Sequence, residues 1–463
     1  MNPQSAGLMW NPQLIERYDM TGPRYTSYPT APQFREDFSE RALLNAIMRS
    51  NKQFKPLSLY FHIPFCESLC YYCGCNKIIT PNKERAKPYL QRLIHELEIQ
   101  GKIFNSSRKV KQLHWGGGTP TFLSDSEMSL LMNATRQHFN LLNDDEGEYS
   151  IEVHPGNLLA STMSHLRRLG FNRVSMGIQD FDENVQKAVN RFNSFAQVKH
   201  LVSHIRKDNY QSISMDLIYG LPLQTEISFS DTLDKVIELS PDRLSLFSYA
   251  HLPHLFKSQQ LIHARDLPSA EQKLLLLQRA IESLGAAGYV YIGMDHFAKP
   301  DDELVKAQQQ GKLQRNFQGY STHGDCDLLA FGVSAISAID NVYMQNAKNI
   351  NEYQTKLDAG VLPYTKGFTL NTEDELRKFI ISQLICYFKL DFAEANEKFQ
   401  VDMQNHCARE LQQLAPMVED GLLSINSQGI QIHSTGRLLV RRVCMVFDEY
   451  LNRDEHIRFS KII

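Results

Sequence analysis

The sequence predicts an α/β fold in which parallel strands alternate with helices and form a partial (β/α)6 barrel of the TIM type. The main observation is a series of short runs rich in β-branched and aromatic residues, separated by stretches long enough for a crossover helix. Right-handed crossovers wind such strands into one curved sheet. The runs lie at residues 57–63, 111–115, 149–153, 173–178, 212–218 and 243–249.

The stretches between these runs carry helix signals. Leu166 and Leu169 lie on an apolar helical face, and Gly170 is placed to end that helix. Ser269 and Gln272 have the spacing of a capping box, in which each side chain bonds a backbone N–H of the other residue. A strongly apolar helix is therefore expected to start after Ser269.

The chain divides into three predicted regions. Residues 1–50 form an N-terminal arm, because Gly22 and several prolines interrupt any regular element there. Residues 51–345 form the barrel domain, and residues 346–463 form a mainly helical, winged-helix-like C-terminal domain. In the last region, alternating apolar residues around residues 426–429 predict a small hairpin.

Composition excludes some classes of partner. The net charge is −3 and no basic stripe is present, so nucleic-acid binding is not expected. No apolar run approaches the roughly 18 residues of a membrane span. Residues 1–10 lack the pattern of a secretory signal, so a cytoplasmic location without membrane contact is expected.

Cysteines are concentrated in one segment. Cys66, Cys70, Cys73 and Cys75 fall within ten residues, directly after the first predicted strand, while the other four cysteines are scattered. The first three have the spacing Cys-x3-Cys-x2-Cys. A four-iron cluster takes one ligand per iron, so three thiolates leave one iron open for another molecule. The spacing therefore favours a [4Fe-4S] cluster on Cys66, Cys70 and Cys73.

Two other sites compete with this interpretation. A zinc site usually pairs two Cys-x2-Cys turns across a longer loop, which this segment lacks. A ferredoxin-type electron carrier has a complete fourth ligand, often followed by proline, whereas Asn76 and Lys77 follow Cys75. Cys75 is separated from Cys73 by one residue, so it would have difficulty reaching another corner of the same cluster.

Unusual residues follow the predicted strands. In a parallel barrel, the loops after the strands share one face, and that face carries the chemistry. Residues far apart in the sequence are therefore expected to converge there. The segments after the six strands read PFC, GGGTP, HPG, QDF, GLP and AHLP.

The Cys-x3-Cys-x2-Cys motif resembles that of the radical S-adenosylmethionine enzymes. Further motifs resemble the oxygen-independent coproporphyrinogen III oxidase family, from about residue 10 to the C-terminus. The segments that carry this resemblance are PRYTSYPTA, HIPFCESLCYYCGCNK, LHWGGGTPT, GFNRVSMGIQDF, DLIYGLP, YAHLP and GMDHFA.

The resemblance implies a specific reaction. In that family the cluster cleaves S-adenosylmethionine to a 5'-deoxyadenosyl radical, which removes a hydrogen from the β-carbon of a propionate side chain of coproporphyrinogen III. Carbon dioxide and an electron then leave. Two propionates become vinyl groups, giving protoporphyrinogen IX. The resemblance also implies a reduced electron donor such as flavodoxin or ferredoxin, and a monomer is expected.

The resemblance further implies two S-adenosylmethionine sites. Singly, each residue has an ordinary structural interpretation: the glycines can form a turn, Glu152 can cap a backbone group, and Asp216 can belong to a structural ion pair. The first site maps onto Tyr60, Gly117, Glu152 and Ile336, and the second onto Tyr72, Gly118, Thr119, Gln179, Arg191, Asp216 and Ala250.

The glycines at 116–118 are expected to let backbone groups approach a ligand closely. Two residues depart from the family pattern: His154 stands where an aspartate is more usual, and Tyr72 replaces a common phenylalanine. His154 is interpreted as a surface histidine or as an addition to the edge of the site.

Two related functions stay open. A haem chaperone of the same descent keeps the cluster motif, but it usually lacks the PRYTSYPTA segment and has CDF after the third cysteine. A radical haem-degrading enzyme would differ in its substrate. For the substrate's carboxylates, Arg24, Lys299 and Arg315 are candidate ligands, each next to a family motif.

Overall fold

The computed structural model of the chain describes residues 7–143, 145–451, 459 and 461–463. Residues 1–6 of the predicted N-terminal arm lie outside the described residues. Within the described part, none of the helices has the length and apolarity that a membrane span requires.

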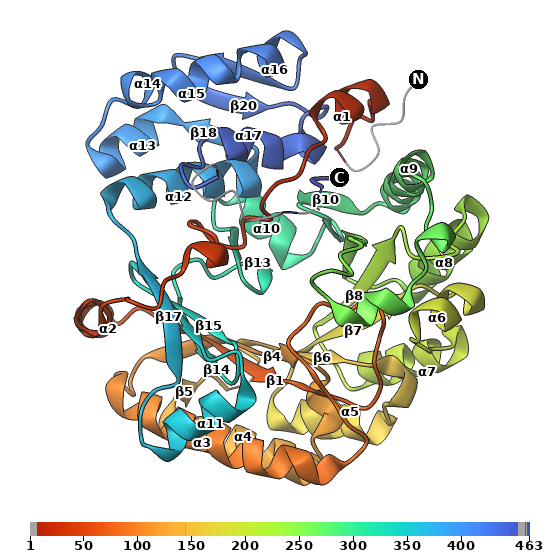
Figure 1. The fold of residues 1–463 in the computed structure, drawn as a ribbon, viewed down its shortest axis with the longest axis vertical. Coiled ribbons are helices and arrows are strands. Elements are labelled where there is room, and N and C mark those ends of the chain that lie inside the picture. The colour runs from red at the N-terminus through yellow and green to blue at the C-terminus, as the bar shows by residue number, and fades with distance from the viewer. Residues whose placement is uncertain (1–6, 144, 452–458, 460) are drawn as a thin grey trace.

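All six predicted strands are present and parallel, which confirms the α/β fold class. They curve into the open barrel seen in Figure 1, with helices on its outer side. Buried apolar residues alternate along several of them with half-buried polar residues. The strands are β1 (Leu57–Ile63), β4 (Lys109–Gly117), β6 (Glu148–Val153), β7 (Arg173–Gln179), β8 (Ser212–Tyr219) and β9 (Arg243–Ser248).

The sheet extends beyond these six strands at both edges. Beside β1 it adds β14 (Asp327–Phe331), which is parallel to β1, and then three antiparallel strands. The additional strands are short and join largely without crossover helices, so the sequence rhythm did not reveal them. They include β15 (Ile336–Ile339), β16 (Val342–Asn346), β17 (Tyr364–Thr369), β10 (Val290–Gly293), β11 (His296–Ala298) and β5 (Asn140–Leu141).

The sheet therefore continues past residue 345, where the sequence places the end of the barrel domain. The strand β17 pairs along the length of β16, with Met344 opposite Gly367. A boundary after β17 agrees with this pairing, because a cut at residue 345 would pass through β16 and separate two hydrogen-bonded strands.

The helices begin and end where the local signals predict. Gly170 ends α5 in the left-handed region at φ 104°, where glycine carries no Cβ penalty. Ser269 and Gln272 form the capping box of α9. The barrel helices are α3 (Ala86–Ile103), α4 (Asp125–His138), α5 (Ala160–Leu169), α6 (Glu183–Val189), α7 (Phe195–Lys207), α8 (Glu226–Leu239) and α9 (Ala270–Ala286).

The C-terminal region packs helices against a three-stranded sheet, and the predicted hairpin is formed by β19 and β20. Its long helix α12 contacts α17. The elements are α12 (Thr372–Tyr387), β18 (Lys389–Asp391), α13 (Phe392–Phe399), α14 (Met403–His406), α15 (Ala408–Gln413), α16 (Ala415–Glu419), β19 (Leu423–Asn426), β20 (Gly429–Ile432) and α17 (Val440–Val446).

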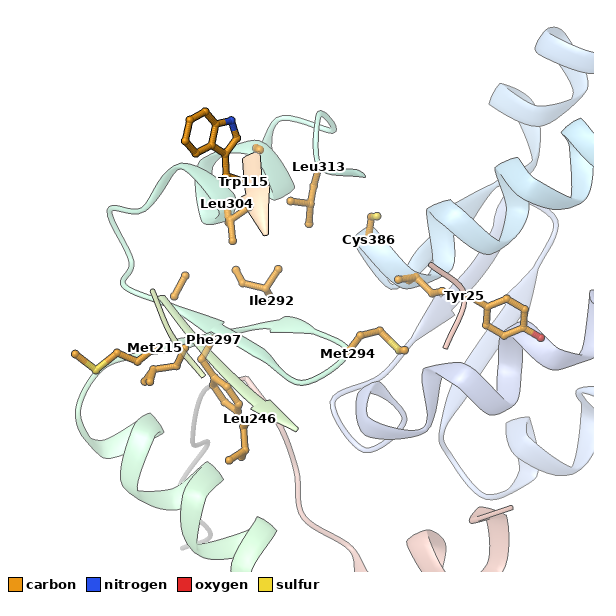
Figure 2. Close-up of a cluster of buried hydrophobic side chains, with 14 of the residues drawn as sticks. Tyr25, Trp115, Met215, Leu246, Ile292, Met294, Phe297, Leu304, Leu313 and Cys386 are labelled. Carbon is orange, nitrogen blue, oxygen red and sulfur yellow. The ribbon is translucent and has the colours of Figure 1, made fainter. Parts of the chain in front are cut away.

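The N-terminal arm joins the barrel to the C-terminal region. It contains α1 (Pro12–Tyr18) and leads into α2 (Glu40–Gln53); in Figure 1 it runs between the blue helices and the barrel. The Arg441 guanidinium on α17 donates to the carbonyls of Gly22 and Pro23. A contacting core spans these parts. Figure 2 shows Tyr25 of the arm near Cys386 of α12, with Phe297 and Met215 farther into the barrel.

Between β11 and β14 the chain forms α10 (Glu303–Gln309) and a hairpin of β12 (Gln314–Asn316) and β13 (Gly319–Ser321). The Ser321 hydroxyl donates to Gln112 of β4 at 2.9 Å, and the Tyr320 hydroxyl donates to the Ile385 carbonyl at 3.1 Å. The hairpin therefore lies between the barrel strands and α12. Another helix, α11 (Ile350–Asp358), packs against α3.

Candidate active site

The cysteine loop leaves the carboxyl end of β1 and is closed at its base. The short strand β2 (Phe65–Cys66) pairs with β3 (Ile78–Ile79), and the Thr80 N–H donates to the Cys66 carbonyl at 2.9 Å. Inside the loop, a turn brings the Cys73 N–H to the Cys70 carbonyl at 3.2 Å. The loop is thus a closed structure that holds Cys66, Cys70 and Cys73 near one another.

All three of these cysteines line one cavity of about 340 Å³ at the mouth of the barrel. Thr119 donates toward the Cys66 sulfur at 3.6 Å, and Arg191 donates toward the Cys70 sulfur at 3.8 Å. Burial raises the pKa of the Cys66 thiol to about 11. A buried thiol of this kind is a thiolate at neutral pH only when a cation stabilises it, which is what a metal ligand requires.

Cys73 and Cys75 have different environments. A hydrogen bond from Cys75, with Lys77 nearby, lowers the pKa of Cys73 to about 6. Cys75 is exposed, and it is not among the residues that line the cavity of the other three cysteines. Its side chain is directed to a neighbouring sulfur rather than to the cavity.

Within the described ranges, no three Cys, His, Asp or Glu side chains converge closely enough to hold a single metal ion. The ligands of a four-iron cluster each bind a different iron, so they need not converge on one point. The three thiols and their shared cavity fit a cluster. The fit is also supported by Arg191 on the cavity wall, whose Nε is buried and has no protein partner among the described residues.

A connected row of side chains crosses the inner face of the barrel. Tyr60 on β1 stacks on His114 of β4, with ring centroids 5.8 Å apart. His114 lies 3.2 Å from Glu152 of β6, and the Gly117 N–H donates to the other Glu152 oxygen at 3.1 Å. These contacts bring together three of the residues assigned to the first S-adenosylmethionine site, namely Tyr60, Gly117 and Glu152.

Ile336 is placed less directly. Tyr60 is opposite Ala330 of β14, and the antiparallel pairing of Leu328 with Ala338 places Ile336 beside Ala330. Residues paired across neighbouring strands share a face, so Ile336 lies in the same row as Tyr60. The Ile336 side chain, which is partly buried, packs against a small group of buried hydrophobic residues that contains Phe34.

The glycines at the end of β4 pack tightly against other parts of the protein. A Cβ on Gly116 would meet the Glu152 carboxylate at 2.8 Å, and one on Gly117 would meet the His62 ring at 2.5 Å. On Gly118 it would meet the backbone of Pro64 at 2.7 Å. Glycine is therefore required at these three positions because protein packs against protein there. Gly117 and Gly118 also line the cavity of the three cysteines, so the expected approach of a ligand to this backbone stays a prediction.

Gln179 and Arg191 approach each other at the end of β7. A Cβ on Gly177 would lie 2.6 Å from the Gln179 amide and 2.9 Å from the Arg191 guanidinium, so Gly177 makes room for both. Among the described residues, Gln179 Oε1 and Arg191 Nε are buried and have no hydrogen-bond partner. Gln179 also has a left-handed backbone, at φ 68°. Unpaired buried polar atoms beside a cavity point to a ligand that completes them.

Asp216 on β8 lies in the barrel interior. It shares a cavity of about 230 Å³ with Glu152, and it accepts hydrogen bonds from Ser175, at 3.5 Å, and Ser245. Burial raises its pKa to about 6. Among the described residues no ion pair joins Arg191 to Asp216, although the Arg191 charge partly offsets the effect of burial on the pKa of Asp216.

The other residues assigned to the second site lie around the cluster cavity or near it. Tyr72, Gly118 and Thr119 line the cavity itself. The Tyr72 hydroxyl hydrogen-bonds to the Cys70 sulfur. Ala250 is half-buried just after β9.

The structure decides between the two interpretations of His154 in favour of the edge of the site, and it corrects Lys299 as a candidate carboxylate ligand. His154 lines the cluster cavity and accepts from the Gly156 N–H at 3.1 Å; burial lowers its pKa to about 3, so it is a neutral wall residue rather than a surface histidine. Lys299 donates to the Ser240 carbonyl and lies 3.4 Å from Asp242, before the start of β9. Lys299 therefore lies at the end of the barrel where the strands begin. The cysteine loop lies at the opposite end, because it follows the carboxyl end of β1.

Some residues of the site were missed from the sequence. His62 bonds to Tyr60 at 3.1 Å and to the Asn76 carbonyl of the cysteine loop at 2.9 Å. Gln318, in the turn of the β12–β13 hairpin, lines the cavity of Glu152 and Asp216 with its amide nitrogen unpartnered in the described structure. Alternation along β1 could have identified His62, but no local signal identifies Gln318.

Comparison with known proteins agrees with this geometry. Residues 60–236 match the model of the radical SAM superfamily, and residues 370–439 match that of the HemN C-terminal domain. The chain is 53% identical over 456 residues to the oxygen-independent coproporphyrinogen III oxidase of Pseudomonas aeruginosa, covering 98% of this chain and 99% of that protein. The Escherichia coli protein of that name is 48% identical, covering 98% of each chain.

The fold agrees with a solved structure as well. Coproporphyrinogen III oxidase (HemN) from Escherichia coli, described as a radical SAM enzyme, superposes with a TM-score of 0.92 at 47% identity, covering 96% of this chain and 100% of that one. Its family uses a [4Fe-4S] cluster and S-adenosylmethionine, and the three thiols that line one cavity here fit the cluster. The chain belongs to the oxygen-independent coproporphyrinogen III oxidase family of radical S-adenosylmethionine enzymes.

Proposed function

We propose that this protein converts two propionate side chains of coproporphyrinogen III to vinyl groups and so produces protoporphyrinogen IX. For each side chain, one hydrogen atom leaves the β-carbon, the bond to the carboxyl carbon breaks to release carbon dioxide, and one electron passes to an acceptor. The observation that carries the proposal is the single cavity shared by Cys66, Cys70, Cys73, Thr119 and Arg191 at the mouth of the barrel.

The cysteines at 66, 70 and 73 are proposed as the cluster ligands. When bound, the cluster supplies the electron that cleaves S-adenosylmethionine. Glu152, whose two oxygens contact Gly117 and His114, is proposed to accept a further hydrogen bond from the amino group of the first S-adenosylmethionine. Tyr60 and Ile336, in one row across the sheet, are proposed to flank the first S-adenosylmethionine.

The second S-adenosylmethionine is proposed to bind at Arg191, Gln179 and Asp216. The unpaired Arg191 Nε and Gln179 Oε1 supply a donor and an acceptor, and Asp216 supplies a carboxylate. Tyr72, Gly118, Thr119 and Ala250 are proposed as neighbouring contacts. We also propose a cytoplasmic monomer that takes its electrons from a reduced flavodoxin or ferredoxin.

Product analysis tests the proposed function. The cluster-loaded protein, incubated without oxygen with coproporphyrinogen III, S-adenosylmethionine and a reductant, should release about two molecules of carbon dioxide per porphyrinogen, because each propionate loses one. The porphyrin formed after oxidation of the product should carry two vinyl groups. The matched control is the Cys66→Ser variant.

Haem binding without release of carbon dioxide would contradict the proposal and favour the chaperone alternative. Consumption of haem in place of the porphyrinogen would favour the haem-degrading alternative.

A further inference from the structure

Arg315 lies in β12, two residues before the turn of the β12–β13 hairpin begins. It pairs across the hairpin with Tyr320, and its guanidinium lies over the Tyr320 ring, 4.9 Å from the centroid. Tyr320 is fixed to α12 by its hydrogen bond to the Ile385 carbonyl. Stacking on a held aromatic ring orders a long side chain without using its N–H donors.

The donors of Arg315 are left free. Its Nε and Nη1 are buried, and neither finds a hydrogen-bond partner in the part of the chain that the structure describes. The other two candidate carboxylate ligands differ in this respect: Arg24 lies 3.7 Å from Asp295, and Lys299 is held by Ser240 and Asp242. A buried N–H donor without a partner costs free energy, so this arrangement is expected where a ligand completes it.

The surroundings of Arg315 are electropositive. Burial is the main cause that lowers the pKa of Arg441 to about 10, and the nearby positive charges of Arg24 and Arg315 lower it further. Burial, and after it the positive charge of Arg315, lowers the pKa of His296 to about 4. The His296 ring is therefore neutral. In the part of the chain that the structure describes, Asp295 is the carboxylate whose charge acts on both Arg441 and His296, and it partners Arg24. Among these described groups, three guanidinium groups and one carboxylate leave a surplus of positive charge, which favours an anionic ligand.

Arg315 also stands where cavities meet. It lines a cavity of about 940 Å³ beside α12 and another of about 400 Å³ that includes Tyr25 and Tyr28 of the arm. Two residues beyond the strand that carries Arg315, Gln318 faces the barrel cavity of Glu152 and Asp216. One hairpin thus reaches both the side cavities and the barrel interior. A ligand with several carboxylates can span these places.

We propose that Arg315 binds a propionate carboxylate of the porphyrinogen and thereby positions the substrate, an inference that rests on the proposed function. The carboxylate is one that does not react while it is bound there. An ion pair stabilises a carboxylate in the ground state, and the reacting group leaves as neutral carbon dioxide, so pairing the reacting group would oppose the reaction. The planar guanidinium offers two parallel N–H donors to such a group.

Steady-state kinetics of Arg315→Gln test this role. The KM for coproporphyrinogen III should rise about ten- to a hundredfold, the range for loss of a hydrogen bond to a charged group, while the KM for S-adenosylmethionine and the iron content are unchanged. The KM of Arg315→Lys for coproporphyrinogen III should lie between those of the wild-type protein and Arg315→Gln. The lysine ammonium keeps the charge but lacks the two parallel N–H donors of the guanidinium. The matched control is Arg409→Gln, which removes an exposed arginine of α15.

Binding of coproporphyrin III, followed by fluorescence, supplies a readout that does not require turnover. A purely structural Arg315 would lower the melting temperature of Arg315→Gln and leave the KM of the folded Arg315→Lys enzyme and its porphyrin affinity at wild-type values. That result would overturn the proposal. Failure of the wild-type protein to release carbon dioxide would instead overturn the proposed function, so the two failures are distinguishable.

Discussion

Replacing Cys66, Cys70 or Cys73 by serine is expected to abolish the visible absorbance of the cluster and all cleavage of S-adenosylmethionine. Each thiol lines the same cavity, and each would bind a different iron, so loss of one leaves a second iron without a protein ligand. Absorbance and iron content of the anaerobically reconstituted variants, with 5'-deoxyadenosine measured by chromatography, check the prediction.

Cys75→Ser is the matched control for those three variants. Cys75 is exposed and bonds to the Cys73 sulfur rather than lining the cavity. The variant should therefore keep about four irons per chain. Loss of the cluster in Cys75→Ser alone would show that the ligand set was assigned wrongly.

Asp216→Asn is expected to weaken binding of S-adenosylmethionine and to make the protein more stable. Burial raises the pKa of Asp216 to about 6 from 3.8, so its ionised form destabilises the fold. This loss of stability is complete when the pH is above about 6, the pKa of Asp216 in the folded protein. It disappears as the pH falls below 3.8, the ordinary pKa of an aspartate. At pH 8 the amide should add about 3 kcal/mol to the free energy of unfolding, and near pH 3 almost nothing.

Stoichiometry separates a ligand role from a structural one. In equilibrium dialysis without oxygen, Arg191→Ala should lower bound S-adenosylmethionine from about two molecules per chain toward one. In the wild-type protein the buried Arg191 cation, with its unpaired Nε–H, is expected to pair with the carboxylate of the second S-adenosylmethionine, and the alanine cannot do so. Thermal melts of Asp216→Asn at pH 8 and near pH 3 complete the test. Unchanged stoichiometry in both variants would mean that these residues do not hold a second molecule.

The sequence predicts those parts of the fold that have local causes. The six barrel strands, the capping box of Ser269 and the end of α5 at Gly170 all follow from patterns within a few residues. The edge strands were missed because they are short and are stabilised by pairing with strands far away in the sequence. Pairing of β14 with β1, for example, joins residues about 270 positions apart.

The same distinction applies to the site. The spacing of the cysteines is a local signal that indicates the chemistry directly. The packing at Gly117 could not be predicted, because the His62 ring that excludes a Cβ comes from another strand. His154 was not placed, because its position on the cavity wall depends on where Arg191 and the cysteine loop lie. Arg315 could not be ranked above Arg24 and Lys299 from the sequence, since an unpaired guanidinium can be distinguished from a paired one only in three dimensions.

Isotope transfer tests the central claim most directly, namely that hydrogen removal from a propionate by the cleaved cofactor drives the decarboxylation. Coproporphyrinogen III deuterated at the propionate β-carbons is incubated anaerobically with the cluster-loaded protein and unlabelled S-adenosylmethionine. The account predicts that the 5'-deoxyadenosine formed carries deuterium and that carbon dioxide is released in step with it. Unlabelled 5'-deoxyadenosine, formed while carbon dioxide is released from the deuterated substrate, would contradict it.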